Sequence, residues 1–92
     1  MVPLKDQKVK EFDHATFECE VSKTGLKAKW LKGDTELKAS DRYEMVTLGQ
    51  RHLLHIHNAE LADQDTYTVV VEEGVTSTAK LTVEGKSRFV IK

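Results

Sequence analysis

The sequence predicts an all-β fold in which two antiparallel sheets pack face to face. Along most of the chain, apolar and polar residues alternate with the period of two that is typical of strands, and apolar residues do not recur at helical spacing. Turn signals containing glycine, aspartate or serine separate the alternating segments at intervals of about ten residues. A chain of 92 residues is long enough to bury one core. About six or seven short strands around one core predict a β-sandwich.

The clearest strands lie in the first third of the chain. In residues 15–21, ATFECEV, every second side chain is apolar and those between are polar or charged, which predicts a strand with one solvated face. Residues 26–32, LKAKWLK, repeat this pattern after a break at the KTG segment 23–25. The segment PLKDQKV, residues 3–9, is expected at a sheet edge, because its proline has no amide hydrogen to donate to a second neighbour.

The middle of the chain contains weaker strand signals. A turn signal at 33–34 precedes a short edge segment around Leu37, and a strand through Tyr43 and Met45 comes next. Residues 52–61, HLLHIHNAEL, supply a further strand with alternating apolar side chains.

The last part of the chain predicts a β-hairpin. Residues 66–84, TYTVVVEEGVTSTAKLTVE, alternate on both sides of a turn at Glu73 and Gly74. The side chains of the last three strands that are expected to face the interior are Leu54, Ile56, Tyr67, Val69, Val71, Ala79, Leu81 and Val83.

A set of residues at characteristic spacing resembles the immunoglobulin domains of the intermediate set. The set comprises a cysteine, a tryptophan about a dozen residues later, and an L-x-I-x-x-A-x-x-x-D-x-x-x-Y-x-V segment, which are Cys19, Trp30, Leu54, Ile56, Ala59, Asp63, Tyr67 and Val69. The resemblance covers residues 3–84 and implies an immunoglobulin-like β-sandwich of Greek-key topology for residues 1–84. Residues 85–92 are then expected to be a linker or the start of the next segment.

The resemblance also implies roles for individual residues. The Tyr67 hydroxyl is expected to bond back to the backbone of the preceding loop, where the Asp63 carboxylate accepts local amide groups. Val69 stands where the family has its second cysteine, so Trp30 is expected to pack over Val69 and Cys19 without a disulfide. The predicted structural core residues are Cys19, Trp30, Leu54, Ile56, Asp63, Tyr67, Val69 and Leu81.

Two residues depart from the family pattern. Phe12 stands where a turn glycine is usual, and Asp65 replaces a small residue in the segment before Tyr67.

Charge and cysteine content disfavour several partners and compartments. Fourteen basic and fifteen acidic residues give a net charge of −1, so neither nucleic acid nor an anionic membrane is an expected partner. The single cysteine, Cys19, cannot form an internal disulfide, and Asn58 is not part of a glycosylation motif. A reducing, cytoplasmic compartment is therefore favoured.

The titratable residues show no pattern typical of catalysis, and no cofactor is expected. His55 and His57 lie two apart on a predicted outer face, while His14 and His52 are not at obviously convergent positions. Because a closed zinc site needs four ligands, we interpret the histidines as solvated surface. Asp63 and Asp65 are interpreted as loop residues and not as a calcium site, because few oxygen ligands lie nearby.

The segments ATFECEVSKTGLKAKWLKGD and RHLLHIHNAELADQDTY resemble modules of the giant intracellular muscle proteins: titin, obscurin and the myosin-binding protein C group. This resemblance implies a non-enzymatic structural module of a giant sarcomeric or cytoskeletal protein that acts as a mechanical spacer and protein-interaction link. Neighbouring immunoglobulin or fibronectin-type domains of the same tandem array are then its partners, with other sarcomeric proteins as further partners. It also implies parallel pairing of Lys5 to Lys10 with Thr78 to Val83.

Two alternatives remain at this stage. The first is a protein-binding scaffold domain, for which Val46, Leu48 and Leu53 are candidate contacts if they are exposed. The second is an extracellular adhesion domain, which the missing second cysteine and the missing glycosylation motif disfavour.

Overall fold

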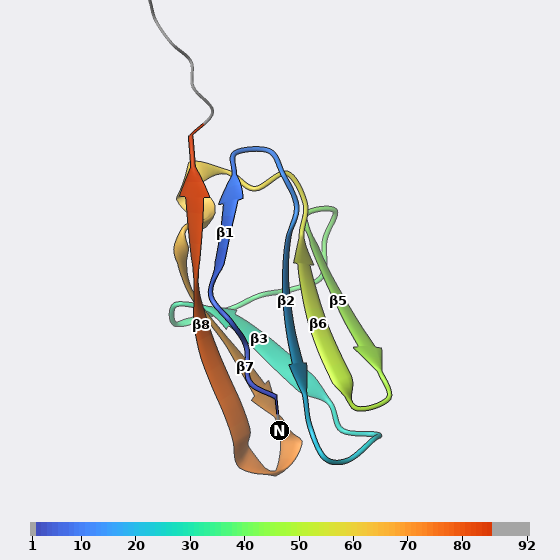
Figure 1. The fold of residues 1–92 in the computed structure, drawn as a ribbon. Coiled ribbons are helices and arrows are strands. Elements are labelled where there is room, and N and C mark those ends of the chain that lie inside the picture. The colour runs from blue at the N-terminus through green and yellow to red at the C-terminus, as the bar shows by residue number, and fades with distance from the viewer. Residues whose placement is uncertain (1, 86–92) are drawn as a thin grey trace, which may run out of the picture.

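The structure, a computed structural model, describes residues 2–85; most of the predicted linker, residues 86–92, lies outside the described residues. The described chain forms two β-sheets, one of three strands in the order β2-β6-β5 and one of five strands in the order β1-β8-β7-β3-β4 (Figure 1). The all-β sandwich prediction is confirmed. The strands are β1 Gln7–Lys10, β2 Ala15–Glu20, β3 Ala28–Lys32, β4 Thr35–Glu36, β5 Tyr43–Leu48, β6 Arg51–Ile56, β7 Asp65–Val71 and β8 Val75–Glu84.

The three-stranded sheet is antiparallel throughout. Phe17 of β2 lies opposite Leu54 of β6, and Leu54 lies opposite Met45 of β5. Because successive side chains of a strand point to opposite faces, this register directs the apolar residues of β2 and β6 toward the other sheet. Phe17 and Leu54 are fully buried as a result.

The five-stranded sheet combines antiparallel pairs with one parallel pair. β7 pairs antiparallel with both β3 and β8, and Trp30 lies opposite Val69. β1 pairs parallel with β8, from Gln7 opposite Leu81 to Lys10 opposite Glu84. The core between the sheets is one cluster of buried apolar side chains contributed by both sheets.

The number of strands differs slightly from the prediction of six or seven, since residues 2–85 form eight. The additional strand, β4, has two exposed residues and pairs only with the end of β3. Leu37 follows β4 directly, donates its amide to the Trp30 carbonyl at 2.8 Å and packs partly buried against the core. The edge segment predicted around Leu37 is therefore present, and it pairs with β3 over only a few residues.

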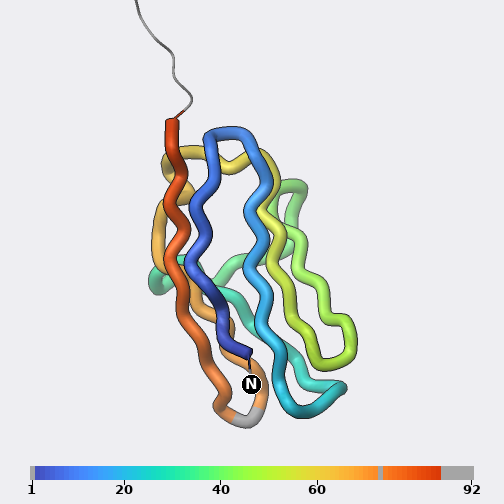
Figure 2. Tube along the Cα trace, in the orientation of Figure 1, coloured from blue at the N-terminus to red at the C-terminus, as the bar shows by residue number. Residues whose placement is uncertain are grey.

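The two ends of the sandwich differ in what they contain. The β1–β2 loop, the β6–β7 connection and the end of β8 lie together at one end, whereas the N-terminal segment and the β5–β6 and β7–β8 turns lie at the other (Figure 2). The short 3₁₀ helix η1, Leu61–Asp63, belongs to the first end, and η2, Glu72–Gly74, forms the β7–β8 turn at the second.

One backbone conformation in the β1–β2 loop is unusual. Phe12, which replaces the usual turn glycine, has a φ of 73°. A residue with a Cβ atom in this left-handed region is destabilised by about 1–2 kcal/mol. Hydrogen bonds on both sides hold the loop in place: Phe12 donates its amide to the Ala59 carbonyl at 2.7 Å, and Ala59 donates to the Asp13 carbonyl at 2.9 Å.

Candidate load-bearing site

The N-terminal segment is attached to the rest of the domain at two successive places. Val2 forms an antiparallel bridge with Glu20 of β2 through backbone hydrogen bonds of 2.8 and 3.0 Å. Five residues later the chain has changed sheets, and β1 pairs with β8. Pro3, which has no amide hydrogen, lies at the start of this crossing.

The β1–β8 pairing is parallel, as the family resemblance implies, but it starts later than expected. Lys5 and Asp6 do not belong to the ladder, which begins at Gln7. The Asp6 carboxylate instead accepts the Lys80 amide at 2.8 Å, so a side chain takes the place of a backbone carbonyl there. Beyond the strand, Glu11 donates its amide to the Glu84 carbonyl at 2.8 Å. Before the strand, Leu4 donates its amide to the Ser77 hydroxyl of β8 at 2.9 Å, so the segment is bonded to β8 from Leu4 to Glu11.

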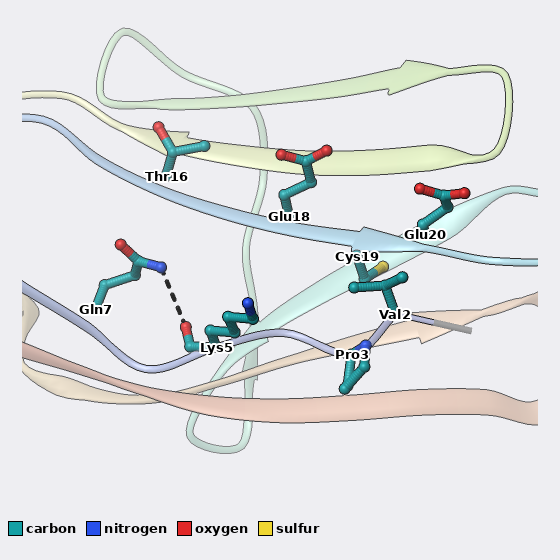
Figure 3. Close-up of a pocket in the computed structure, with 8 residues that line it drawn as sticks. All are labelled: Val2, Pro3, Lys5, Gln7, Thr16, Glu18, Cys19 and Glu20. Atoms are coloured by element: carbon teal, nitrogen blue, oxygen red, sulfur yellow. Dashed lines mark hydrogen bonds between the residues drawn. The ribbon is translucent and has the colours of Figure 1, made fainter.

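A shallow groove of about 420 Å³ separates this segment from β2 (Figure 3). Its lining mixes polar and apolar side chains, with Lys5, Gln7, Thr16 and Glu18 beside Val2 and Pro3, and Gln7 donates a hydrogen bond along its own segment to the Lys5 carbonyl at 3.3 Å. These side chains contain no nucleophile paired with a base, so the groove has no feature of a catalytic site.

The eight structural core residues predicted from the sequence lie in the interior of the sandwich. All of them are buried, with exposed fractions between 0 and 2 %. Trp30 and Val69 are direct neighbours across β3 and β7, and both belong to the same buried cluster as Cys19. Cys19 is a free thiol, and burial raises its pKa, which keeps it protonated and unreactive.

The corner between β6 and β7 is built around Asp63. The hydroxyl of Tyr67, fully buried, donates to the Asp63 backbone carbonyl at 2.6 Å. The Asp63 carboxylate caps its own helical turn by accepting the Glu60 amide at 2.7 Å. Burial raises the pKa of Tyr67, so its hydroxyl remains a donor. This hydrogen bond ties the start of β7 to the crossing between the sheets.

Three side chains from other elements also converge on the Asp63 carboxylate. Arg42 forms an ion pair and hydrogen bond with it, and the Tyr43 hydroxyl donates to it at 3.3 Å. The Lys32 Nζ atom lies 3.9 Å from Asp63 Oδ1, which is near the upper limit for an ion pair. Burial lowers the pKa of Arg42, but the Asp63 contact outweighs this effect and raises it. Sequence reasoning missed Arg42 and Lys32, because nothing in their local sequence indicates which loop they face.

The structure corrects the interpretation of His52. Its side chain is fully buried and faces the core beside Leu54, instead of lying on the solvated surface. The ring Nδ1 atom lies 3.0 Å from the Thr47 hydroxyl, and burial lowers the pKa of His52. The period of two in β6 contained the signal, because residue 52 shares a face with residues 54 and 56.

The other histidines lie on the outer side of the three-stranded sheet, where two of them meet. The Nδ1 atoms of His14 and His57 are 3.2 Å apart, and His57 Nε2 lies 3.2 Å from a Glu44 carboxylate oxygen. The expectation that His14 would not converge with the others is therefore wrong. Within residues 2–85, no group of three or more histidine, cysteine or carboxylate side chains is arranged to hold a metal ion.

The apolar residues proposed as scaffold contacts lie on this outer side as well. Val46 and Leu53 are paired across β5 and β6, and both are partly exposed. Leu48, two residues beyond Val46 on the same face, is 61 % exposed. The three residues form an apolar strip on the three-stranded sheet, which we call the outer strip.

Comparison with known proteins supports the same architecture. The model of the immunoglobulin I-set domain matches residues 1–84. Human cardiac-type myosin-binding protein C is 40 % identical over 86 residues, which are 91 % of this chain and 7 % of that protein. Drosophila melanogaster titin is 39 % identical over 82 residues, 89 % of this chain. This chain thus spans less than a tenth of the length of these relatives.

Solved structures of titin modules are similar in both fold and sequence. The crystal structure of titin domain I10 has a TM-score of 0.85 at 35 % identity and covers 90 % of this chain and 93 % of that one. The titin I9–I11 tandem has a TM-score of 0.89 at 38 % identity, with 94 % of this chain and 32 % of the tandem covered. Within residues 2–85, no helix has the length and apolar character needed to span a membrane. The chain belongs to the immunoglobulin I-set family and is homologous to the immunoglobulin modules of titin and myosin-binding protein C.

Proposed function

We propose that this chain is a non-catalytic, load-bearing module of a giant sarcomeric protein in the cytoplasm of muscle. Its partners in this role are the neighbouring immunoglobulin or fibronectin-type domains of the same array. Relatives that are myosin-binding protein C or titin are 35–41 % identical to this chain, and the similar I9–I11 structure is a tandem from titin. Because these relatives are muscle proteins, they do not support the alternative function of an extracellular adhesion domain.

The parallel β1–β8 pair is the observation that carries this proposal. β1 follows the N-terminus at one end of the sandwich, whereas β8 leaves at the other end (Figure 1). Tension between the two ends therefore pulls β1 and β8 along their own axes in opposite directions. All hydrogen bonds between them then bear load together, which slows forced unfolding more than breaking them one at a time.

Force spectroscopy on a tandem repeat of the domain tests the proposal. In a strand, the backbone groups that face one neighbouring strand belong to every second residue. Because the amide of Glu11 donates to β8, the amide of Val9 also faces β8, and the amide of Lys10 faces away from it. We expect Val9→Pro to lower the rupture force at a given pulling speed and Lys10→Pro to leave it near that of the wild type. Val9→Ala controls for lost packing, since Val9 packs against the core.

The result that contradicts a load-bearing role is equally specific. If Val9→Pro and Lys10→Pro rupture at the same force as the wild type, the β1–β8 ladder does not carry the load. Unfolding in urea, measured on the same variants, separates a loss of mechanical resistance from a general loss of stability.

The outer strip favours a second candidate function, which is binding to a sarcomeric protein. The human relative that is 40 % identical is by name a myosin-binding protein. If this chain binds myosin through the outer strip, Leu48→Glu weakens its co-sedimentation with myosin filaments. Leu61→Glu is the matched control, because Leu61 is also exposed but belongs to η1 at the opposite end. Equal binding by both variants contradicts this function.

A further inference from the structure

His14 and His57 extend the pairing of β2 with β6 by one position. Ala15 lies opposite Ile56 in this antiparallel pair, so the residue before β2 lies opposite the residue after β6. The two imidazole rings are perpendicular, with centroids 5.1 Å apart, and their Nδ1 atoms are separated by 3.2 Å. The strand register therefore brings two ring nitrogen atoms together where the β1–β2 loop and the chain after β6 lie side by side (Figure 2).

The distance between the two nitrogen atoms fits a shared zinc ion. Imidazole nitrogen binds zinc at about 2.0–2.1 Å, so two such ligands of a tetrahedral ion lie about 3.3 Å apart. The observed separation of 3.2 Å between the Nδ1 atoms of His14 and His57 is close to this value. Because a hydrogen bond between the rings has a similar length, the argument also needs the groups that surround the pair.

The carboxylate of Glu44 orients His57 as a ligand. Its Oε1 atom lies 3.2 Å from His57 Nε2, the ring nitrogen that does not face His14. An ionised carboxylate only accepts hydrogen bonds, so it holds the proton of neutral His57 on Nε2 and leaves the lone pair of Nδ1 free to bind a cation. Histidines that bind metal ions are typically oriented by a carboxylate in this way. The ring of His14 is exposed, so it can adopt the same tautomer.

The other charged and titratable groups beside the pair have partners of their own. The ring of His55 lies 6.3 Å from that of His57, and its Nδ1 atom is 3.0 Å from the Thr16 hydroxyl. Arg42 accepts the His57 amide through its carbonyl at 2.8 Å. Its guanidinium group, however, is paired with the Asp63 carboxylate, which balances the positive charge.

We propose that His14 and His57 form a surface site for a divalent transition-metal ion that favours imidazole ligands, with zinc as the ion of choice. Each ring contributes its Nδ1 atom, Glu44 orients His57, and water completes the coordination. The site has two protein ligands, in agreement with the lack of a larger ligand group within residues 2–85. The bound ion links the β1–β2 loop to the end of β6. It does not depend on the load-bearing role, because it lies on the three-stranded sheet, outside the β1–β8 ladder.

Calorimetric titration of the full chain with zinc chloride tests the proposal. The chain carries no histidine tag, and the pH is about 7.5, where free imidazole is mostly neutral. We expect one saturable equivalent of zinc to bind. Glu44→Gln should weaken the affinity about tenfold, as is typical for the partner of a metal-binding histidine. His14→Gln and His57→Gln should each weaken it further, because only one ligand remains.

His55→Gln serves as the matched control. His55 lies on the same outer face of β6 as His57, but its Nδ1 atom is bonded to Thr16 and does not face the pair. This variant should bind zinc with nearly the affinity of the wild type. The proposal is overturned if the wild type does not bind zinc, if His14→Gln or His57→Gln binds it as tightly as the wild type, or if His55→Gln loses binding to the same extent.

Urea unfolding in zinc chloride provides a second measurement that depends on the folded state. At a free zinc concentration ten times the dissociation constant, the equilibrium constant for unfolding should decrease about elevenfold if only the folded chain binds the ion. The decrease should be much smaller in His14→Gln, which keeps every other group that could bind zinc after unfolding. An equal decrease in the wild type and in His14→Gln overturns the assignment of the site to this pair.

Discussion

Replacing Tyr67 with phenylalanine removes one hydroxyl from the interior and leaves the ring in place. The hydroxyl donates a 2.6 Å hydrogen bond to the Asp63 carbonyl, and Tyr67 is fully buried. A net contribution of about 1 kcal/mol for the bond, plus about 1 kcal/mol for the carbonyl left without its donor, gives a loss of about 2 kcal/mol. For a domain of this size, this corresponds to a decrease in Tm of about 8–16 °C.

Urea unfolding followed by the fluorescence of Trp30 measures this loss. Trp30 is the only tryptophan and is 2 % exposed, so its emission reports on the core. Tyr43→Phe is the control, because the Tyr43 hydroxyl donates a longer, 3.3 Å hydrogen bond to the Asp63 carboxylate and its removal should cost less than about 1 kcal/mol. If Tyr67→Phe changes the free energy of unfolding by less than about 0.5 kcal/mol, or if Tyr43→Phe is equally damaging, the Tyr67 hydroxyl does not anchor this corner.

Three further predictions concern a turn, a buried ring and a buried thiol. Gly33→Ala and Gly49→Ala should each destabilise the domain by about 1–2 kcal/mol in urea unfolding, because both glycines have positive φ values, 59° and 62°. The two losses should be similar, because an added Cβ at Gly33 meets Asp65 only at an ordinary contact distance of 3.4 Å and one at Gly49 meets nothing; an unchanged free energy of unfolding in either variant contradicts this. Burial holds the pKa of His52 below its ordinary value of 6.5, so below that pH the unfolded chain binds a proton that the folded chain does not. Stability should therefore fall by up to about 1.4 kcal/mol per pH unit as the pH decreases below 6.5, and His52→Gln should reduce this slope; an unchanged slope contradicts the assignment. Cys19 should react with a thiol reagent only in denaturant, because it is buried and its pKa is raised; rapid labelling of the folded protein contradicts this.

Strand alternation made most of the core predictable, because the period of two depends only on local backbone geometry. Cys19, Trp30 and Val69 could be placed inside from their own neighbours in the sequence. His52 follows the same alternation, since it is buried at an inward position of β6 despite being polar. Its residue type alone suggested a place on the surface. In this strand, position decided burial: the Thr47 hydroxyl lies beside the ring Nδ1 atom, whereas the buried Nε2 atom has no hydrogen-bond partner among the described residues.

The resemblance to a family extended the prediction from local structure to specific contacts. It implied the Tyr67 hydrogen bond to the preceding loop and the parallel pairing of the first and last strands, both of which the structure contains. It did not indicate where the ladder begins. Before Gln7, Leu4 and Asp6 contact β8 through side-chain hydrogen bonds with Ser77 and Lys80, and Val2 bridges to Glu20 of the other sheet.

The strand pattern, the interior positions and the absence of an internal disulfide all follow from the order of the residues, because each depends on near neighbours or on a simple count. The convergence of Arg42 and Tyr43 on Asp63, the meeting of His14 with His57, and the hydrogen bond of Glu11 to Glu84 at the end of β8 do not follow from it. Those contacts join residues that are about 20 to 70 positions apart, and they exist only after two sheets have packed and set the path of every loop.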